Sequence, residues 1–327
     1  MLLTKKRKSK LFKFFKLTRI PDLPFTLGID PGNLCNLKCP LCPTGLGEPG
    51  VKRGFLTFDL FKSIFDQLKD NLSVINLFNW GEPLLNKDLI KIIKYVKSEK
   101  RLIVVTTSTN LNLRDRILLE ELIKTGIDKI IVSCDGARQE TYEKYRVGGN
   151  FDLVIENLRF LVAKNRELGN KTNIIWNFLV FKHNEHEVEV ARKIASDIQV
   201  NFNVGLMRTS LKDEILKSHK EAIERDKSWI PDNPDYSAYD KISCTTKKVL
   251  STCRKPWDSI AINWDGLVFP CCAVYGENYQ FADAKKESIR DIWNNSKFVA
   301  ARNEILNKKC AATTICGLCR NNGFMHM

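Results

Sequence analysis

Three cysteines lie close together near the start of the chain, in the stretch GNLCNLKCPLCPTG. They are Cys35, Cys39 and Cys42, and their spacing is C-x3-C-x2-C. Thiolates are soft ligands that suit zinc or an iron–sulfur cluster. Three thiolates on one loop can hold three irons of a 4Fe–4S cube and leave the fourth iron open to a small chelating ligand. The spacing favours such an open cluster; the alternatives are a zinc site completed from elsewhere and cysteines without metal.

A second set of cysteines lies in the C-terminal part of the chain. Cys253 is followed by Cys271, which stands in a G-x4-C arrangement with Gly266, and by Cys316 and Cys319 as C-x2-C. A hairpin that carries one cysteine and a later C-x2-C pair can close a four-cysteine metal site. The spacing alone leaves structural zinc as an alternative to a fully ligated cluster.

Four of the eleven cysteines belong to neither set. The G-x4-C spacing selects Cys271 over its neighbour Cys272, and Cys310 is a candidate ligand of a second auxiliary cluster. Cys244 has no assignment, and Cys134 is expected to be a small buried residue within a strand. The odd number, the clustering and the lack of a secretory signal predict a reducing, cytoplasmic compartment and metal-binding cysteines.

Strand-like and helical stretches alternate from residue 26 to residue 207. Apolar strands with little alternation, each followed by a helix, predict a parallel sheet that is covered on its faces. Six such units fit an α/β fold, an open partial (β/α)6 TIM-like barrel, whose chemistry belongs in loops after the strands. The expected strands are 25–30, 74–80, 102–108, 128–136, 173–181 and 200–207, and the expected helices are 58–68, 88–98, 113–126, 151–169 and 185–198.

Composition divides the chain into four segments. Residues 1–25 form a basic leader, 26–207 the barrel, 208–252 a polar linker or substrate-side segment, and 253–327 a small cysteine-rich domain. The last segment contains SIAINWDGLVFPCC, which predicts a β-hairpin with the Asp-Gly pair at its turn.

The motifs in combination resemble the radical S-adenosylmethionine (SAM) enzymes. CNLKCPLC follows the first expected strand, and GEP (81–83), STN (108–110) and SCDGA (133–137) follow the next three in the order of that family. The stretch ETYEKYRVGGNFDLVIENL is similar to a segment of the branch that carries SPASM or twitch extensions. Two positions depart from the family pattern: Leu41 replaces a usual aromatic residue, and Trp80 replaces a glycine. Neither departure is expected to remove activity.

The resemblance implies a binding site for SAM at the open iron. The amino and carboxylate groups of SAM would chelate this iron, with Ser133 and Arg146 near the carboxylate and ribose. An Arg–carboxylate pair there would be charge-assisted, although Arg146 is alternatively a surface salt bridge. Thr or Asn after a strand also makes an ordinary helix cap. The residues that the resemblance assigns to SAM are Gly81, Glu82, Thr109, Asn110, Ser133 and Arg146.

The resemblance also implies the reaction class. An electron donor such as flavodoxin or ferredoxin would reduce the cluster, SAM would be cleaved to a 5′-deoxyadenosyl radical, and that radical would abstract a hydrogen atom from the substrate. The tail is similar to the twitch domain, with one auxiliary 4Fe–4S cluster, because the C-x5-C-x2-C run is shorter than the full SPASM pattern. A cluster of this kind can accept a second electron. We therefore expect redox modification, a dehydrogenation, of a sugar, aminocyclitol or similar natural-product intermediate.

Other outcomes remain open at the level of sequence. A radical quenched by a hydrogen donor such as Cys272 or Cys310 would give epimerisation instead of oxidation. A peptide-modifying maturase is a further alternative. The roughly 25 residues before the barrel are too few for a winged-helix domain that grips a leader peptide, which makes this alternative less favoured.

Positive charge is concentrated at the start of the chain. Residues 1–20 carry eight Lys or Arg and no acid, so the net charge of +14 leaves only +6 for the rest. This distribution argues against an RNA-binding protein with zinc-bound cysteines.

The leader mixes Leu11, Phe12, Phe14, Phe15 and Leu17 with lysines, which indicates a short helix on an anionic membrane surface, peripheral to the membrane. The alternative is a solvated tail whose aromatic side chains pack on the domain. No apolar run approaches the ~18 residues of a membrane span.

Overall fold

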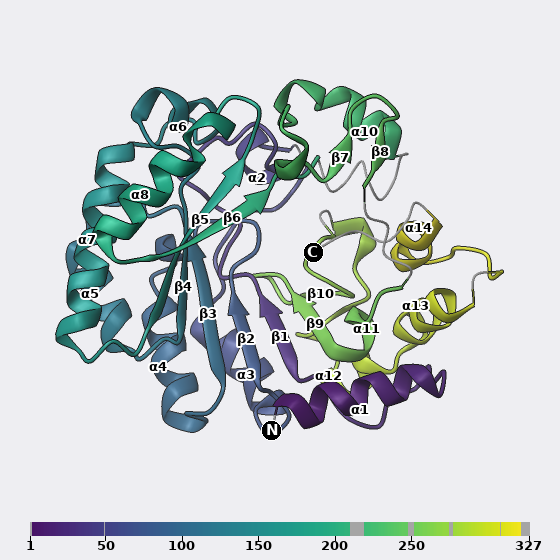
Figure 1. Ribbon diagram of the computed structural model, residues 1–327. Helices are drawn as coiled ribbons and strands as arrows, with labels where there is room; N and C mark the ends of the chain where they lie inside the picture. The colour runs from purple at the N-terminus through teal and green to yellow at the C-terminus, as the bar shows by residue number, and fades with distance from the viewer. Residues whose placement is uncertain are drawn as a thin grey trace.

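The parallel sheet predicted from the alternating pattern is the centre of the molecule. The computed structural model describes residues 2–48, 50–209, 219–247, 252–274, 277–307 and 309–321. Six parallel strands follow one another in chain order across the sheet, and helices cover its outer face (Figure 1). The strands are β1 (Thr26–Ile29), β2 (Val74–Leu77), β3 (Val104–Thr109), β4 (Lys129–Ser133), β5 (Asn173–Val180) and β6 (Asn201–Leu206). The prediction of an α/β partial barrel is confirmed.

The helices between these strands form where the apolar spacing placed them. In α3, the buried residues Phe61, Ile64, Phe65 and Leu68 recur at intervals of three and four, so that one face packs on the sheet. The helix begins where the Thr57 hydroxyl accepts a hydrogen bond from a backbone N–H of the first turn. The helices of the barrel are α3 (Phe58–Leu68), α4 (Leu89–Glu99), α5 (Arg116–Lys124), α6 (Gln139–Tyr145), α7 (Phe151–Glu167) and α8 (Val188–Ile198).

The C-terminal hairpin is part of the same sheet as the barrel. β9 (Ser259–Ile262) pairs in parallel with β1, and β10 (Leu267–Phe269) returns antiparallel to β9. Gly266 takes a φ of 89° at the turn, which confirms the predicted hairpin. With β11 (Ala282–Asp283) at the edge, the sheet formed by the described residues has nine strands in the order β11-β10-β9-β1-β2-β3-β4-β5-β6. The tail therefore continues the barrel sheet, an arrangement that the sequence analysis did not predict.

The described part of the tail also contains helices beside the hairpin. Trp293 and Phe298, which are buried on these helices, pack against each other. The tail helices are α11 (Lys255–Asp258), α12 (Ile289–Trp293), α13 (Ser296–Leu306) and α14 (Ile315–Asn321).

The polar segment predicted as a linker has regular structure in its described part. It contains α10 (His219–Arg225) and a small hairpin of β7 (Tyr239–Asp240) and β8 (Thr245–Thr246). Trp229 packs against Tyr145 and Phe181 of the barrel, with ring centroids 5.9 and 5.7 Å away. These aromatic contacts hold the segment against the barrel, so it is more ordered than its polar composition indicated.

The basic leader forms a helix that is attached to the tail. α1 (Leu2–Phe14), at the lower right of Figure 1, packs against α11 of the tail. Ser9 is buried and donates a hydrogen bond to Asp258. Beyond the helix, the Leu17 carbonyl accepts a bond from the Trp257 indole at 2.9 Å. The leader therefore has a packed face and a free face. No helix among the described residues is long and apolar enough to cross a membrane.

Candidate active site

The three cysteines of the first motif lie on the loop that follows β1. The Cys42 amide donates to the Cys39 carbonyl at 3.1 Å, which folds the loop back on itself. A Cβ atom on Gly45 would lie 2.5 Å from both backbone N and O of Cys39, so glycine permits this close turn. Cys39 is buried, whereas Cys35 and Cys42 are partly exposed.

The loop after β2 packs directly on the cysteine loop. A Cβ atom on Gly81 would lie 2.1 Å from the carbonyl oxygen of Gly32, and no side chain fits there. The next residue, Glu82, donates its backbone N–H to the Leu34 carbonyl at 2.8 Å. Trp80 is buried beside Gly81, and both residues line a cavity beside the cysteine loop. The tryptophan that replaces a glycine of the family pattern therefore still permits the close approach of Gly81 to the Gly32 carbonyl.

Glu82 connects the ends of β2 and β3. It is buried, and its carboxylate accepts hydrogen bonds from the amides of Leu84 at 3.1 Å and Asn110 at 2.7 Å. Burial raises the pKa of Glu82, and these hydrogen bonds act in the opposite direction. The Asn110 side chain lies 3.7 Å from the Cys35 sulfur and donates to Asn36 at 2.9 Å. Asn110 therefore supports the cysteine loop directly.

Arg146 lies beside the cysteine loop with only 13% of its side chain exposed, so it is not the surface salt bridge that the sequence left as an alternative. Its Nε atom lies 2.6 Å from Asp135, which is fully buried, and its Nη1 atom lies 3.9 Å from the Cys39 sulfur. Burial raises the pKa of the Asp135 carboxyl, and the guanidinium opposes this shift. The pair places a fixed positive charge next to a cysteine of the motif.

One cavity of ≈ 170 Å³ brings the predicted residues of this site together. The three cysteines and all six residues assigned to SAM line it, and Ser108 lies beside Ser133 with their hydroxyl oxygens 3.3 Å apart. The donor set consists of three sulfurs, a carboxylate, a guanidinium and hydroxyls. This set fits a cluster with an open iron together with a zwitterionic ligand.

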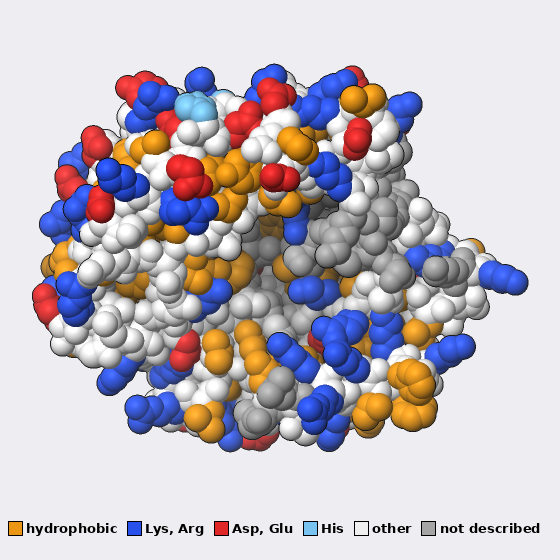
Figure 2. Space-filling view, in the orientation of Figure 1, with side chains coloured by type: hydrophobic (Ala, Val, Ile, Leu, Met, Phe, Trp, Pro, Cys, Tyr) orange, Lys and Arg blue, Asp and Glu red, His pale blue; other side chains and the backbone are white. Residues whose placement is uncertain are grey.

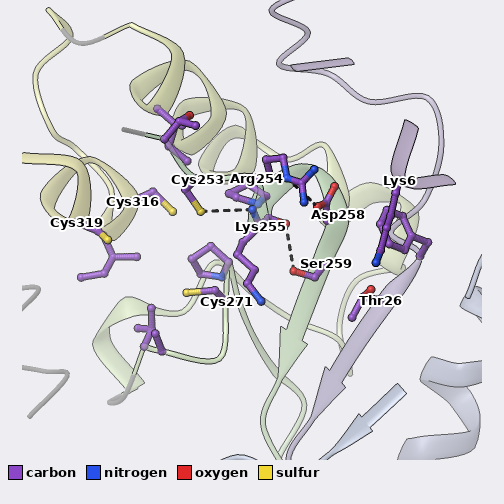
Figure 3. Close-up of a pocket in the computed structure, with 18 residues that line it drawn as sticks. Lys6, Thr26, Cys253, Arg254, Lys255, Asp258, Ser259, Cys271, Cys316 and Cys319 are labelled. Carbon is purple, nitrogen blue, oxygen red and sulfur yellow. Dashed lines mark hydrogen bonds and ion pairs between the residues drawn. The ribbon is translucent and has the colours of Figure 1, made fainter. Parts of the chain in front are cut away.

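The four tail cysteines line a second cavity, of ≈ 430 Å³. Cys253 precedes α11, Cys271 follows β10, and the other two lie on α14. Figure 3 shows the four sulfurs around one space. Burial raises the pKa of the Cys271 and Cys316 thiols well above the usual value, which is typical of thiols that become thiolates only with a metal. The arrangement fits a fully ligated soft-metal site.

The remaining cysteines are not among the residues that line this cavity. Cys272 and Cys310 are partly exposed and do not line the cavity of the described residues, and Cys310 accepts a bond from Asn303 at 3.4 Å. Cys134 is buried just after β4, as expected of a small apolar residue. Cys244 is buried under α10 and donates to Glu224 at 3.1 Å. Among the described residues, no three His, Cys, Asp or Glu form a site for a single metal ion.

Two acidic residues of the site were missed by the sequence analysis. Asp135 lies within the SCDGA motif, where its position after a strand was the available signal. Asp30 lies at the end of β1 and is 1% exposed, and one of its carboxylate oxygens has no hydrogen-bond partner in the described structure. Burial raises the pKa of Asp30 to about 7.

Asp30 is expected to make stability depend on pH. Because its pKa is raised on folding, the native state binds a proton that the unfolded state releases above about pH 4. The contribution of the protonated Asp30 to the stability of the native state is complete below about pH 4, and it is lost as the pH rises through about 7. Between about pH 5 and about pH 8, the wild type should lose about 3 kcal/mol relative to Asp30→Asn. Anaerobic urea unfolding of both proteins measures this difference, and parallel pH curves would contradict it.

The comparisons with known proteins agree with this geometry. Residues 29–194 match the radical SAM superfamily, and residues 253–320 match SPASM, an iron–sulfur cluster-binding domain. The chain therefore belongs to the radical SAM superfamily. It is a radical SAM enzyme with a SPASM domain, and its cofactors are 4Fe–4S clusters and SAM.

Relatives with assigned activities differ from one another in reaction. The AdoMet-dependent heme synthase of Methanosarcina barkeri is 28% identical over 195 residues, which cover 58% of this chain and 53% of that protein. The PqqA peptide cyclase of Bradyrhizobium diazoefficiens is 26% identical over 298 residues, which cover 84% of this chain and 74% of that protein. The chain thus spans about half the length of the heme synthase.

Solved structures of the same fold include two radical SAM proteins. SuiB of Streptococcus suis, bound to S-adenosylmethionine, aligns with a TM-score of 0.62 and 17% identity over 91% of this chain and 72% of that chain. BtrN in complex with AdoMet and 2-DOIA aligns with a TM-score of 0.54 and 19% identity over 88% of each chain. At these identities the likeness establishes the fold.

Proposed function

We propose that this protein is a radical SAM dehydrogenase whose auxiliary 4Fe–4S cluster accepts an electron from the substrate. The observation that carries the proposal is the convergence of Cys253, Cys271, Cys316 and Cys319 on one cavity. This cavity belongs to the same sheet as the cysteine loop, because β9 pairs directly with β1. A second redox centre attached to the same sheet suits a reaction that must remove an electron as well as a hydrogen atom.

In this proposal Cys35, Cys39 and Cys42 hold the radical-forming cluster. When bound, that cluster and SAM supply the 5′-deoxyadenosyl radical. Arg146 would neutralise the carboxylate of SAM and fix its position, since a largely buried guanidinium held by Asp135 has little freedom to move. The other polar groups assigned to SAM position its amino group and ribose. These groups are Gly81, Glu82, Thr109, Asn110 and Ser133.

The oxidation balances with the two sites together. An alcohol carbon that becomes a ketone loses two hydrogen atoms. One leaves as a hydrogen atom to the adenosyl radical, and the other leaves as a proton and an electron. The four tail cysteines would hold a centre that could accept this electron, and the proton would pass to a base. Flavodoxin or ferredoxin is the proposed donor of the electron that starts each cycle.

The substrate class that we propose is a sugar, an aminocyclitol or a similar natural-product intermediate. The likeness to BtrN extends over an equal share of both chains, which makes 2-DOIA a suitable first probe.

A peptide-modifying maturase is the second candidate. The match to the PqqA peptide cyclase over 84% of this chain favours it.

The test compares a quartet variant with a matched cysteine variant. Reduced wild type, Cys253→Ser and Cys310→Ser are each incubated with SAM and with 2-DOIA, a panel of amino sugars or unmodified precursor peptides. The proposal expects Cys253→Ser to form 5′-deoxyadenosine while its yield of oxidised sugar falls at least about tenfold, and Cys310→Ser to behave as wild type. Equal sugar oxidation by Cys253→Ser would contradict the electron-acceptor role. Turnover of peptides alone would favour the maturase.

The free face of α1 is proposed to contact an anionic membrane surface. Phe14 and Phe15 are 77% and 65% exposed, and their rings are in edge contact. Figure 2 shows Lys and Arg side chains gathered around this end of the molecule. Exposed aromatic side chains next to basic charge supply both the apolar and the electrostatic part of interfacial binding.

Vesicle sedimentation tests the membrane contact without removing the packed helix. Wild type should sediment with phosphatidylserine vesicles, less so at high salt, and Phe14→Ser/Phe15→Ser should lose most of this binding. Leu102→Ser is the matched control, because Leu102 is 82% exposed elsewhere on the surface. Equal sedimentation of wild type with neutral and anionic vesicles would rule the contact out.

A further inference from the structure

The cavity of the tail cysteines is bordered by a lysine whose charge is not neutralised. Lys255 begins α11 two residues after Cys253, and its side chain lines the cavity among the labelled cysteines in Figure 3. Its backbone N–H lies 3.4 Å from the Cys253 sulfur. Within the described part of the chain, its ammonium forms no hydrogen bond or ion pair. A charge of this kind acts on whatever occupies the space between the sulfurs.

The leader helix brings a second lysine to the same site. Lys13 of α1 donates to the Cys253 carbonyl at 3.0 Å and to the Thr252 hydroxyl. Its ammonium also lies 5.7 Å from the centre of the Trp257 ring. Although it is 240 residues away in sequence, Lys13 is thus fixed directly against a cysteine of the quartet.

A third cation lies behind the cavity wall. Arg302 of α13 is fully buried, and its guanidinium donates only to neutral oxygens, of Pro256, Thr18, Trp293 and Asn294. No carboxylate pairs with it among the described residues. Burial lowers the pKa of Arg302 to about 9, and Cys316 acts in the opposite direction. An unpaired buried cation is costly unless negative charge lies near it.

The acidic groups around the cavity do not balance these cations. Asp258 is the one carboxylate that lines the described cavity wall. It already accepts a bond from Ser9 and lies 3.8 Å from Arg254. Burial raises the pKa of Asp258 to about 6, and the surrounding Arg and Lys charges act in the opposite direction. Glu304 is a further buried carboxylate, and its charge acts on the Cys316 thiol. Lys6 and Arg254 also line the cavity, so the named cations outnumber these two carboxylates and the shell carries net positive charge.

We propose that Lys255 and Lys13, with Arg302 behind them, raise the reduction potential of the cluster held by the tail cysteines. Reduction adds a negative charge to a cluster, so fixed positive charges nearby favour the reduced form. This inference rests on the proposed function and deepens it, because a raised potential makes the centre a better acceptor of the substrate electron. It also gives the packed face of the leader helix a role in the redox chemistry of a site at the other end of the chain.

The experiment isolates the auxiliary centre in the full-length chain. Replacement of Cys35, Cys39 and Cys42 by Ala leaves the tail quartet as the source of the paramagnetic signal. Lys255→Met and Lys13→Met are introduced separately into this background, with Lys255→Arg as the charge-retaining variant. Lys10→Met is the matched control, because Lys10 lies on the exposed face of the same helix. The midpoint potential of each protein is measured by redox titration followed by electron paramagnetic resonance.

Lys255→Met and Lys13→Met should each lower the equilibrium constant for reduction of the cluster on the order of tenfold. This corresponds to a fall of about 59 mV in the midpoint potential for one electron. Lys10→Met and Lys255→Arg should keep the potential of the parent. Potentials unchanged in both Lys255→Met and Lys13→Met, with iron content intact, would overturn the inference alone. Absence of any cluster signal in the parent would overturn the proposed function and this inference with it. If Lys255→Met loses its cluster, Lys13→Met decides the question.

Discussion

Cys39→Ala is expected to reduce cleavage of SAM to the uncatalysed background, with or without substrate. The cysteine lies at the centre of the motif, is buried, and has the Arg146 guanidinium 3.9 Å from its sulfur. With two thiolates left, a cube on this loop would have two irons without a protein ligand. The site would then no longer offer SAM a single open iron. Formation of 5′-deoxyadenosine from SAM and dithionite, quantified by chromatography, measures the loss.

A buried cysteine outside both sets provides the control for this experiment. Cys244→Ala removes a thiol that is also buried but is bonded to Glu224 under α10. It should keep cleavage close to the wild-type rate and retain the same iron content. Substantial cleavage by Cys39→Ala, or an equal loss in Cys244→Ala, would contradict the assignment of the triad.

Arg146→Met is expected to cost about 3–5 kcal/mol in the free energy of unfolding, because it leaves a buried carboxylate without its partner. Asp135 is fully buried and lies 2.6 Å from the Nε atom of Arg146. Its other oxygen accepts the amide of Leu179 at 2.7 Å, a bond too weak to replace the ion pair. Affinity for SAM should fall as well, since the cavity loses its buried cation. Anaerobic denaturant unfolding and equilibrium binding of SAM measure the two effects.

Two further variants distinguish the effect of breaking this ion pair from the effect of breaking an exposed one. The double variant Arg146→Met/Asp135→Asn should recover part of the lost stability, because no buried charge remains. Arg116→Met, which breaks an exposed pair with Glu156, should change the free energy of unfolding by about 1 kcal/mol or less. Equal destabilisation by Arg116→Met and Arg146→Met would mean that the buried pair has no special role.

The first site was predictable from sequence because of where parallel strands end. GEP, STN and SCDGA each lie at or just after the end of a strand, and the carboxyl ends of parallel strands meet at one edge of a sheet. The strands β1 to β6 lie in the sheet in their chain order, so residues as distant as Cys35 and Arg146 fall beside one cavity. Local patterns were sufficient for this part.

The arrangement of the tail could not be predicted in the same way. The hairpin itself was visible in SIAINWDGLVFPCC, but the partner of β9 is β1, over 200 residues earlier. Pairing between such distant strands depends on the whole fold and leaves no periodic signal in the sequence. The C-terminal iron–sulfur domain was therefore predictable from the sequence, but the continuation of the barrel sheet through its hairpin was not.

Buried charge and the packed face of the leader were also beyond sequence reasoning. Lys13 and Phe14 are neighbours in a stretch for which the sequence left two alternatives open, a helix on a membrane surface and a solvated tail whose aromatic side chains pack on the domain. In the structure one is fixed against Cys253 and the other is exposed. Asp30 gave no signal of burial either, since it precedes a loop of polar and small residues.

The central claim is that two separate cysteine sets hold two 4Fe–4S clusters in one chain. Iron, sulfide and zinc should be measured in anaerobically purified wild type, in a variant that lacks Cys35, Cys39 and Cys42, and in one that lacks Cys253, Cys271, Cys316 and Cys319. The account predicts about eight irons in the wild type and about four in each variant, all without zinc. One zinc per chain, or a variant that loses all of its iron or none of it, would contradict the account.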